Sequence, residues 1–458
     1  MPTFAAAMKI STENKISHYS ALMRLGLPIV VGQLGNIVLG FADTLMIGHH
    51  DMKELAAAGF VNNMMMLIIV FAMGFSYGLT PVVGRMFGMG EKRETGRALR
   101  AGLAANSMMA VLMLSVAVML YIFLPYMGQP EELMVHMKPY LIVNIVSLPF
   151  ICWLNTFKQF YDAIGDTKMP MYVIIGGNAL NIIGNYALIY GNFGLPELGL
   201  LGAGLSTLTS RIAMFAAFAL IFANARRYQE QRIGLRSGST DRTIFKQLNA
   251  LGWPIALQMG MESAAFSLTA IFSGWIGTTS LAAHQIVVTV SQLFFMIYYG
   301  LAAAVAVRVS HFSGQRDLSA VTRTAACGFH IILLVAVTVS IPIFLLRDTI
   351  GYWFTDDAEV CALVATTVIP LIAYQFGDGM QCNYANALRG LQHVKPMMLI
   401  AFVSYFVISL PLSWFAGIYL EFGLVGVWCG APVSLMFAGI MYYMSFRKKI
   451  TKEKALAE

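Results

Sequence analysis

The chain has 458 residues, of which 58% are hydrophobic and only 12% charged, and its mean hydropathy is +0.69. A soluble domain is typically about a quarter charged and under half apolar, so this composition excludes an ordinary soluble protein. The net charge of +7 would suggest a nucleic-acid partner in a soluble protein, but the placement of the basic residues has a membrane explanation.

Twelve apolar stretches are each long enough to cross a bilayer as a helix, which takes about 20 residues. Glycine, proline and charged clusters separate them. In chain order their approximate limits are 22–48, 55–81, 98–124, 138–160, 169–190, 200–224, 248–276, 281–309, 322–346, 360–386, 396–419 and 424–446. The first twenty residues lack the short apolar core and cleavage site of a secretory signal, so no cleavage is expected. The predicted fold class is all-α, a polytopic membrane protein.

The basic side chains predict the orientation. If the N-terminus is cytoplasmic, all but four of the 30 Lys and Arg residues fall on the cytoplasmic side, with Arg389 counted in the loop after span ten. Lys53, Lys138 and Arg347 fall outside, and Arg211 lies within span six. The excess of Lys and Arg in cytoplasmic loops then places both termini in the cytoplasm.

Short motifs repeat at one offset of 226 residues. "LGLP" at 25–28 returns as "LGWP" at 251–254, and "LAA" at 55–57 and "PM" at 170–171 return likewise. Six spans per repeat is an even number, so the two halves run parallel, as in transporters built from two related bundles. The expected division is an N-lobe at 1–224, a cytoplasmic linker at 225–247 and a C-lobe at 248–458. The linker is too polar to span and has no strong helical stripe, so it is expected to be a connector.

Three carboxylates fall well inside predicted spans: Asp43, Glu262 and Asp378. Ionisable groups in a membrane normally face the bundle interior or a watery cavity and are functional candidates. A structural ion pair with Arg211, or a protonated acid that caps a helix, is the alternative. One intramembrane Arg cannot neutralise three acids, so a bound cation or proton is expected on them.

Polar neighbours predict a wet interior. Gln33 and Asn36 precede Asp43, and span five carries Asn178, Asn181 and Asn185. Asn181 and Asn185 are four residues apart and therefore share a helix face. A hydrogen bond between helices is an equal alternative to cavity lining.

Asp378 lies between Gly377 and Gly379, where a bend would expose backbone carbonyls that suit hard cations. Close helix packing is the alternative reading of these two glycines.

Other signals are weak. His284 has no partner at metal-ligand spacing, so a helix-end hydrogen bond is favoured. The five cysteines form no CxxC pair and are interpreted as apolar fillers. There is no Walker A sequence and no nucleophile–base motif, so neither ATP nor an enzymatic reaction is expected, and no cofactor is predicted.

The chain resembles the multidrug and toxic compound extrusion (MATE) family, in particular its NorM-like branch. The matching stretches are "LGLPIVVGQLGNIVLGFADTLMIG" in span one, "MESAAFS" in span seven, "LAAHQ" before span eight and "ALRG" at 387–390, and the resemblance extends from Leu25 to Phe446. It implies two six-helix lobes and export of organic cations and drugs in exchange for Na⁺ or H⁺.

The resemblance also implies site residues. Asp43, Glu262 and Asp378 match the acids that couple to the ion, and Glu262 and Asp378 are the expected Na⁺ ligands. The expected substrate cavity residues are Gln33, Asn36, Asn181, Asn185, Thr207, Phe266, Gln285 and Phe295. Some relatives carry a Tyr in span eight where this chain has Phe295.

The favoured function is therefore a multidrug efflux antiporter of a bacterial inner membrane, in contact with lipid and monomeric. A lipid-linked oligosaccharide flippase of the same superfamily is the nearest alternative, although an anionic lipid would favour cationic cavity residues. An intramembrane enzyme would have only His284 with a buried acid, and a channel fits a two-lobe repeat less well.

Overall fold

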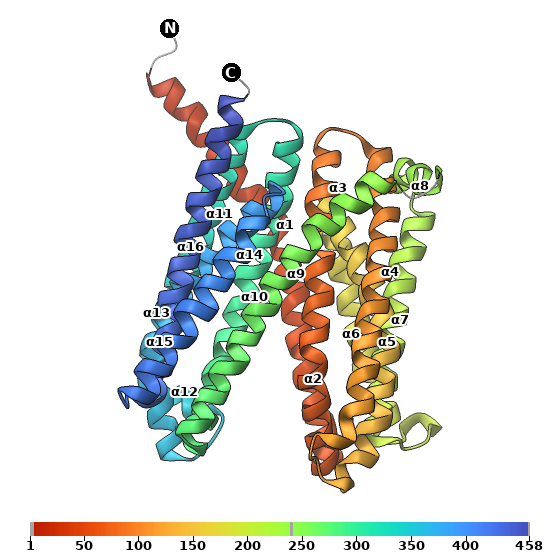
Figure 1. Ribbon diagram of the computed structural model, residues 1–458. Coiled ribbons are helices and arrows are strands. Elements are labelled where there is room, and N and C mark those ends of the chain that lie inside the picture. The colour runs from red at the N-terminus through yellow and green to blue at the C-terminus, as the bar shows by residue number, and fades with distance from the viewer. Residues whose placement is uncertain (1–3, 239–240, 457–458) are drawn as a thin grey trace. The chain divides into compact units, whose positions relative to one another are not determined.

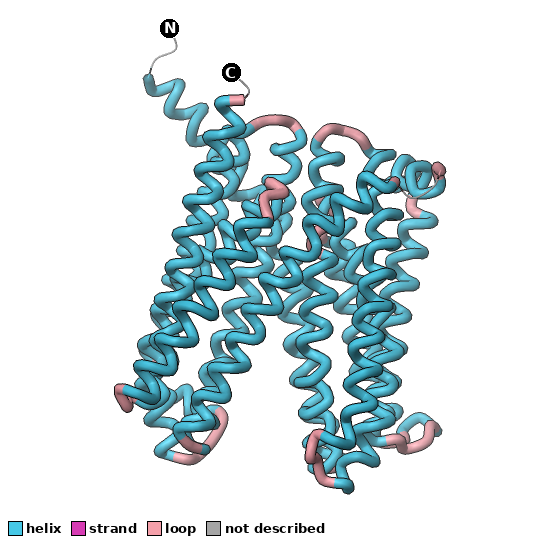
Figure 2. The backbone as a smooth tube through the Cα atoms, in the orientation of Figure 1, coloured by secondary structure: helices cyan, strands magenta, loops and turns pink. Residues whose placement is uncertain are grey.

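The computed structural model describes residues 4–238 and 241–456, and side chains from residue 17 onward. Figure 2 shows these residues as helices joined by short loops, with no strand among them. The chain divides into two compact units. Unit 1 comprises Met1–Val30 and Gln258–Glu458, and unit 2 comprises Val31–Leu257. The division falls inside two long helices, α1 and α9, a few residues after Pro28 and Pro254.

Figure 1 labels the helices in chain order. The elements up to the linker are α1 (Phe4–His50), α2 (Met52–Ser76), α3 (Leu79–Gly88), α4 (Lys92–Phe123), η1 (Leu124–Tyr126), α5 (Glu131–Ala163), α6 (Lys168–Ile189), η2 (Asn192–Gly194), α7 (Gly199–Asn224), η3 (Arg226–Tyr228) and α8 (Gln229–Arg236). The remaining elements are α9 (Arg242–Ile276), α10 (Thr278–Gly314), α11 (Leu318–Leu345), α12 (Arg347–Ile350), η4 (Gly351–Trp353), α13 (Ala358–Gly390), α14 (Lys395–Phe402), η5 (Val403–Ser409), α15 (Leu410–Trp414), η6 (Phe415–Tyr419) and α16 (Gly423–Ala455).

Twelve helical segments of the described chain are long and apolar enough to cross a membrane. The first is Ser17–His50 and the last is Gly423–Ala455, so most extend several residues beyond the limits expected from hydropathy. Helices continue past the apolar core because polar residues near their ends are also good helix formers. The prediction of an all-α protein with twelve spans is confirmed. The lobe boundaries at 225–247 stay a prediction.

Span eleven is the least regular helix. It consists of α14, η5, α15 and η6, and both η5 and η6 are wider π-type turns. Pro411 lies at the start of α15 and cannot donate a backbone hydrogen bond, which favours such a local widening. The widened turns present Tyr405 and Ser409 as buried side chains inside unit 1.

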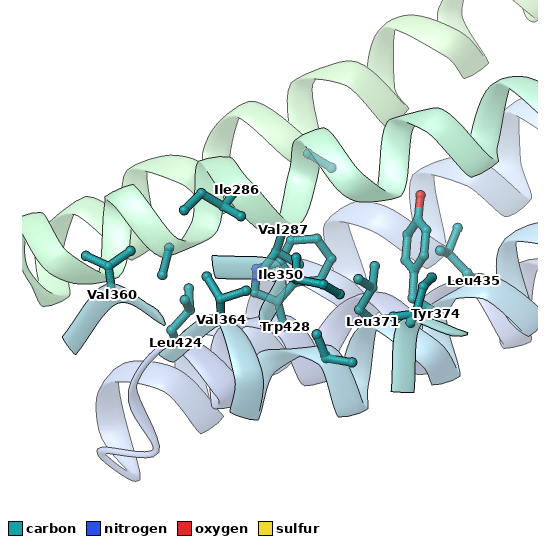
Figure 3. Packing of buried hydrophobic residues seen from close by; sticks show 14 of the residues in the cluster. Ile286, Val287, Ile350, Val360, Val364, Leu371, Tyr374, Leu424, Trp428 and Leu435 are labelled. Carbon is teal, nitrogen blue, oxygen red and sulfur yellow. The ribbon is translucent and has the colours of Figure 1, made fainter. Parts of the chain in front are cut away.

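An apolar cluster holds the helices of unit 1 together. Figure 3 shows Trp428 of α16 among Val364 and Leu371 of α13 and Val287 of α10, and all four are nearly fully buried. Phe266 and the other partly buried side chains of α9 pack against this cluster. Lipid tails are as apolar as these side chains, so close van der Waals packing holds the cluster together, and this packing gives the polar groups beside it a rigid support.

The linker is more ordered than its composition indicates. Residues 229–236 form the helix α8, which packs against the beginning of α4 within unit 2 (Figure 1). The backbones approach closely: a Cβ at Gly96 would lie 1.9 Å from the Gln231 carbonyl oxygen, and one at Gly234 would lie 1.8 Å from that of Arg93. The absence of a strong helical stripe did not reveal α8, because paired glycines allow a docking that hydrophobic periodicity does not show. The role of this stretch as a cytoplasmic connector stays a prediction.

A hydrogen bond from a tyrosine also holds the linker in place. The Tyr228 hydroxyl donates a hydrogen bond to Asp166 in the connection between α5 and α6. Burial, together with the Asp166 carboxylate, raises the pKa of Tyr228. The phenol therefore stays protonated and keeps donating at physiological pH.

Candidate functional site

Asp43 lies near the C-terminal end of α1, within unit 2, and its carboxylate is held by α6. The Asn185 side-chain nitrogen donates to Asp43 Oδ1 at 2.5 Å. Asn185 itself is fully buried. A charge-assisted hydrogen bond of this length is a strong contact, so the two helices fix the position of the carboxylate.

Asn181 completes this contact one helical turn away. With its amide rotated by half a turn, the nitrogen lies 3.0 Å from Asp43 Oδ1 and the oxygen accepts from the Thr207 backbone N–H at 3.2 Å. This orientation satisfies donors and acceptors on both sides, which is the criterion for assigning an amide. The predicted shared face of Asn181 and Asn185 is thus confirmed, and Thr207 of α7 lies beside it.

The two other polar residues of α1 that were predicted to line the cavity, Gln33 and Asn36, lie closer to the N-terminus than Asp43. Asn36 is exposed, and its Oδ1 lies 3.5 Å from the side-chain nitrogen of Asn178 on α6. Gln33 is buried. Asn36 and Asp43 thus both contact asparagines of α6.

Arg211 makes no contact ion pair with Asp43. No ion pair within 4.0 Å joins the two among the described residues, and the Arg211 guanidinium instead donates to the Ser147 hydroxyl at 2.5 Å. The structural ion pair considered as an alternative is therefore not formed. The Asp43 carboxylate is surrounded by the neutral side-chain amides of Asn185 and Asn181, so a cation or a proton can bind to it and leave again.

Glu262 of α9 lies in unit 1 and is bound by two glutamines. Gln258 donates to Glu262 Oε2 at 3.0 Å, and Gln381 of α13 donates to Oε1 at 3.4 Å. The Tyr405 hydroxyl donates to Gln381 Oε1 at 3.0 Å. These hydrogen bonds place the acid between α9, α13 and span eleven.

Arg389 also belongs to this network. It is 5% exposed and donates to Gln258 Oε1 at 2.7 Å. Its assignment to the loop after span ten was wrong, since α13 continues to Gly390. Arg211 is therefore not the only arginine within a span, and the positive charge of Arg389 lies one glutamine away from Glu262.

Asp378 occupies a more isolated position in the same unit. It is fully buried, Cys382 Sγ lies 3.7 Å from Oδ1, and Oδ2 has no hydrogen-bond partner. The Tyr298 hydroxyl and both side-chain polar atoms of Gln375 are likewise buried without a partner. Buried polar atoms are normally satisfied, so these unpartnered atoms make the surroundings of Asp378 a candidate site for a proton or a cation.

The helix does not bend at Asp378. α13 runs without interruption from Ala358 to Gly390, so the expected bend with exposed carbonyls is wrong. A Cβ at Gly377 would lie 3.0 Å from the Met436 backbone nitrogen, and one at Gly379 would lie 2.8 Å from Ile332. The two glycines instead allow α16 and α11 to pack closely.

The donor set fits a proton at least as well as a metal ion. Within the described residues no group of three or more His, Cys, Asp or Glu side chains is arranged to hold a metal. A hard cation prefers about six oxygen ligands, and the orphaned oxygens of Asp378, Gln375 and Tyr298 would supply part of such a set. Na⁺ ligation by Glu262 and Asp378 therefore stays a prediction.

The other predicted cavity residues line different parts of unit 1. Phe266 packs edge to face against Tyr374, with ring centroids 6.2 Å apart, and Phe295 packs against Tyr299. Gln285 is exposed. His284 is buried, and its Nδ1 accepts from Trp428 Nε1 at 3.1 Å, so it makes a side-chain contact rather than a helix-end bond.

A small cavity lies among Phe266, His284, Tyr405 and Trp428. About 20 Å³ is available there to the centre of a water molecule. This is room for about one water molecule. Because Tyr405 borders the cavity and contacts Gln381, water there would lie near the network of Glu262.

Sequence reasoning missed Gln258, Gln375, Gln381, Tyr298 and Tyr405. The sequence could have indicated them only by their polarity inside apolar spans. Tyr and Gln are common in such helices, so only the tertiary contacts distinguish these five from the other Tyr and Gln residues of the spans.

Comparison with known proteins gives consistent findings. The model of the MatE family matches residues 28–187 and 254–415, two segments that begin 226 residues apart. The chain is 30% identical over 424 residues, 93% of each chain, to a protein of Xanthomonas axonopodis pv. citri named probable multidrug resistance protein NorM. It is 29% identical over 465 residues to a protein of that name from Xylella fastidiosa, covering 100% of this chain and 98% of that one. The crystal structure of a MATE in complex with MaL6 matches with a TM-score of 0.85 at 20% identity, over 96% of this chain and 97% of that chain, which is a likeness of fold.

Proposed function

Because this chain belongs to the MatE family, we propose that it is a multidrug efflux transporter that exports amphipathic organic cations in exchange for H⁺ or Na⁺. The proposed location is a bacterial inner membrane, with both termini in the cytoplasm, and the chain acts without an enzymatic step.

The observation that carries this proposal is the environment of Asp43. Its carboxylate is held by the amides of Asn185 and Asn181 and has no ion-pair partner among the described residues. An ionised carboxylate in a poorly solvated site attracts an organic cation strongly, because the interaction of two charges about 4 Å apart reaches about 4 kcal/mol at an effective dielectric constant of about 20.

Protonation of Asp43 supplies the release step. A proton that arrives from the outside cancels the negative charge, and the cation loses its electrostatic partner. A ligand shifts a conformational equilibrium only by its different affinity for the two states. The proton must therefore bind more tightly to the releasing state of unit 2, and desolvation of the charged carboxylate favours this.

Glu262 and Asp378 supply a second ion-responsive site in unit 1. Asp378 Oδ2 and the Gln375 side chain are buried without partners, which supports the binding of a proton or a hard cation there. Their charge state would change the packing of α13, the helix that carries Asp378, Gln381 and Arg389.

A flippase for anionic lipids is supported less well. The polar centre of unit 2 is a carboxylate among amides, and Arg389 in unit 1 is bound to Gln258 within a network that includes Glu262. A negatively charged lipid would be repelled by ionised Asp43.

Transport in sealed vesicles tests the proposal. Purified protein is reconstituted, a fluorescent organic cation is added, and Na⁺ and H⁺ gradients are imposed separately. Accumulation of the cation under at least one gradient, and none without a gradient, is expected. Failure of either gradient to drive transport of any organic cation, together with unchanged drug susceptibility of cells that lack the gene, would contradict it.

A further inference from the structure

The end of α1 carries ionisable side chains that the proposed function leaves unused. His50 Nδ1 lies 2.8 Å from Glu54 Oε2, and His50 Nε2 lies 3.0 Å from Glu197 Oε1. The three residues come from the last turn of α1, the first turn of α2 and the connection between α6 and α7. All three belong to unit 2.

The geometry requires an extra proton. An ionised carboxylate can only accept hydrogen bonds, and a neutral imidazole has a single N–H to donate. A neutral His50 between two ionised carboxylates could therefore donate only one of its two hydrogen bonds. Both contacts are hydrogen bonds only when one more proton is bound, either on the second ring nitrogen or on a carboxylate. The arrangement of His50, Glu54 and Glu197 is that of a site with an exchangeable proton bound.

The carboxylate of Glu54 lies beside the N-terminus of a helix. Glu54 is 6% exposed and lies against the first residue of α7, because a Cβ at Gly199 would be 2.2 Å from Glu54 Oε1. Gly199 has a φ of +54°, which glycine adopts without strain. The N-terminus of a helix stabilises negative charge nearby, and Glu54 lies at this position.

The neighbouring charges are few. His136 of α5 lies 3.5 Å from Glu54 Oε1, and Lys53 is paired with Glu132 at 2.5 Å. Asp51 caps α2 by accepting from the Lys53 backbone N–H at 2.6 Å. His49 is exposed and contacts the Leu45 carbonyl of its own helix at 2.8 Å. None of these groups bonds to His50 among the described residues.

Water reaches the cluster. His50, Glu54, His136 and Glu197 line a cavity of about 530 Å³, and the side chain of Glu197 is 66% exposed. An unperturbed histidine changes its charge near pH 6.5, within the range that bacterial surroundings cover. The proton on this cluster can therefore exchange with the solution.

The cluster lies directly along the helix from Asp43. Seven residues separate Asp43 from His50, which is about two helical turns, so the two side chains share a face about 10 Å apart. In the orientation predicted from the Lys and Arg residues, His50 is on the outer side of Asp43. The cluster also lies at the ends of the helices that form the Asp43 site. It includes the last residue of α1 and a residue of the connection between α6 and α7, and these three helices carry Asp43, Asn185 and Thr207.

We propose that His50, Glu54 and Glu197 form an external proton-loading site that binds the coupling proton before it reaches Asp43. The proton leaves an imidazole nitrogen, passes through water to the Asp43 carboxylate, and the neutral imidazole then takes another proton from outside. The identity of the acceptor rests on the proposed function, whereas proton binding at His50 does not.

Proton binding is tested by NMR on full-length protein labelled with ¹³C at the histidine rings. His50→Gln assigns the His50 signal by its loss, and this signal is then titrated from pH 5 to pH 9 in wild type and in Glu197→Gln. Removal of one carboxylate partner is expected to weaken proton binding about tenfold, which is a shift of about one pH unit in the midpoint. Glu132 is similarly exposed but contacts Lys53 instead, so Glu132→Gln should leave the midpoint unchanged. A His50 signal that titrates identically in Glu197→Gln and wild type would overturn the loading site.

Transport tests the transfer to Asp43. In reconstituted vesicles, His50→Gln is expected to export a fluorescent cation several-fold more slowly than wild type at external pH 7. The difference should vanish near external pH 5, where bulk protons reach Asp43 directly. His49→Gln, one residue away, should behave as wild type, and an unchanged external-pH profile in His50→Gln would overturn the relay. If Asp43→Asn instead keeps proton-driven export, the proposed acceptor is wrong while the NMR titration still decides whether the loading site exists.

Discussion

At the scale of single residues, Asp43 is the group with the clearest functional geometry. Two amides from α6 hold one of its oxygens, and Arg211 of α7, which could have paired with it, is bonded to Ser147 instead. The carboxylate is therefore positioned by neutral donors, which leave its charge available to a cationic ligand.

Substitution of Asp43 by Asn should abolish this attraction without a change of shape. We expect Asp43→Asn to bind a cationic drug at least tenfold more weakly than wild type, because a few kcal/mol of charge attraction is lost. Its affinity should no longer vary with pH, since the variant resembles the protonated form permanently. Drug binding to the purified variant from pH 5 to pH 9 is the measurement. If affinity and pH dependence match those of wild type, Asp43 does not switch the ligand.

The acids of unit 1 should affect coupling rather than folding. We expect Glu262→Gln and Asp378→Asn to be expressed at wild-type levels, since a neutral amide is no costlier in these positions than an unpaired carboxylate. Each should reduce ion-driven export about tenfold or more under a fixed gradient. Initial rates in vesicles measure this, and wild-type rates in both variants would rule out a coupling role.

At the scale of elements, the contact between α4 and α8 depends on two glycines. A Cβ at Gly96 or Gly234 would meet a backbone carbonyl oxygen at less than 2 Å, so the helices would have to separate. Backbone atoms cannot move aside as a flexible side chain can, which makes this contact sensitive to a single methyl group.

Replacement of Gly96 by Ala should therefore destabilise the docked linker. We expect a loss of about 1–3 kcal/mol, the usual cost of overpacking, and faster proteolysis between residues 229 and 241. Gly176→Ala is the matched control, because Gly176 lies in the helix α6 with open space around it. Thermal unfolding in detergent and limited trypsin digestion report the difference. Equal stability of the two variants would show that the position of α8 does not depend on the close contact of its backbone with that of α4.

At the scale of the whole molecule, the membrane orientation is the main open prediction. The beginning of α1 and the end of α16 lie at the same end of unit 1 (Figure 1), as an even number of spans requires. Arg389 no longer counts toward the cytoplasmic loops, because it is buried, but the excess of basic residues there hardly changes.

Cysteine labelling in intact cells tests the orientation. In a variant without the five native cysteines, Ser237→Cys in the linker should not react with a membrane-impermeant thiol reagent added outside. Asp356→Cys, in the exposed connection between η4 and α13, should react. The reverse pattern would place the termini and the linker on the outer side.

The amino-acid sequence by itself determined the class, the number of spans and the positions of the three acids. These properties follow from local chemistry: a span needs about 20 apolar residues, and a carboxylate within it is visible as an exception. The spacing of Asn181 and Asn185 also predicted that they share a helix face, because helical periodicity places residues four apart together. That this face meets Asp43 is a finding of the structure.

Only the tertiary structure decided which polar side chains meet. Arg389 looked like a loop residue, yet the continuation of α13 buries it next to Gln258, and His50, Glu54 and Glu197 converge from segments up to 147 residues apart in the chain. The helix of the linker likewise depends on the fit of Gly96 to Gly234 across two elements. Contacts between distant segments depend on how helices pack, and helical periodicity in one segment carries no information about the partner that the segment will meet.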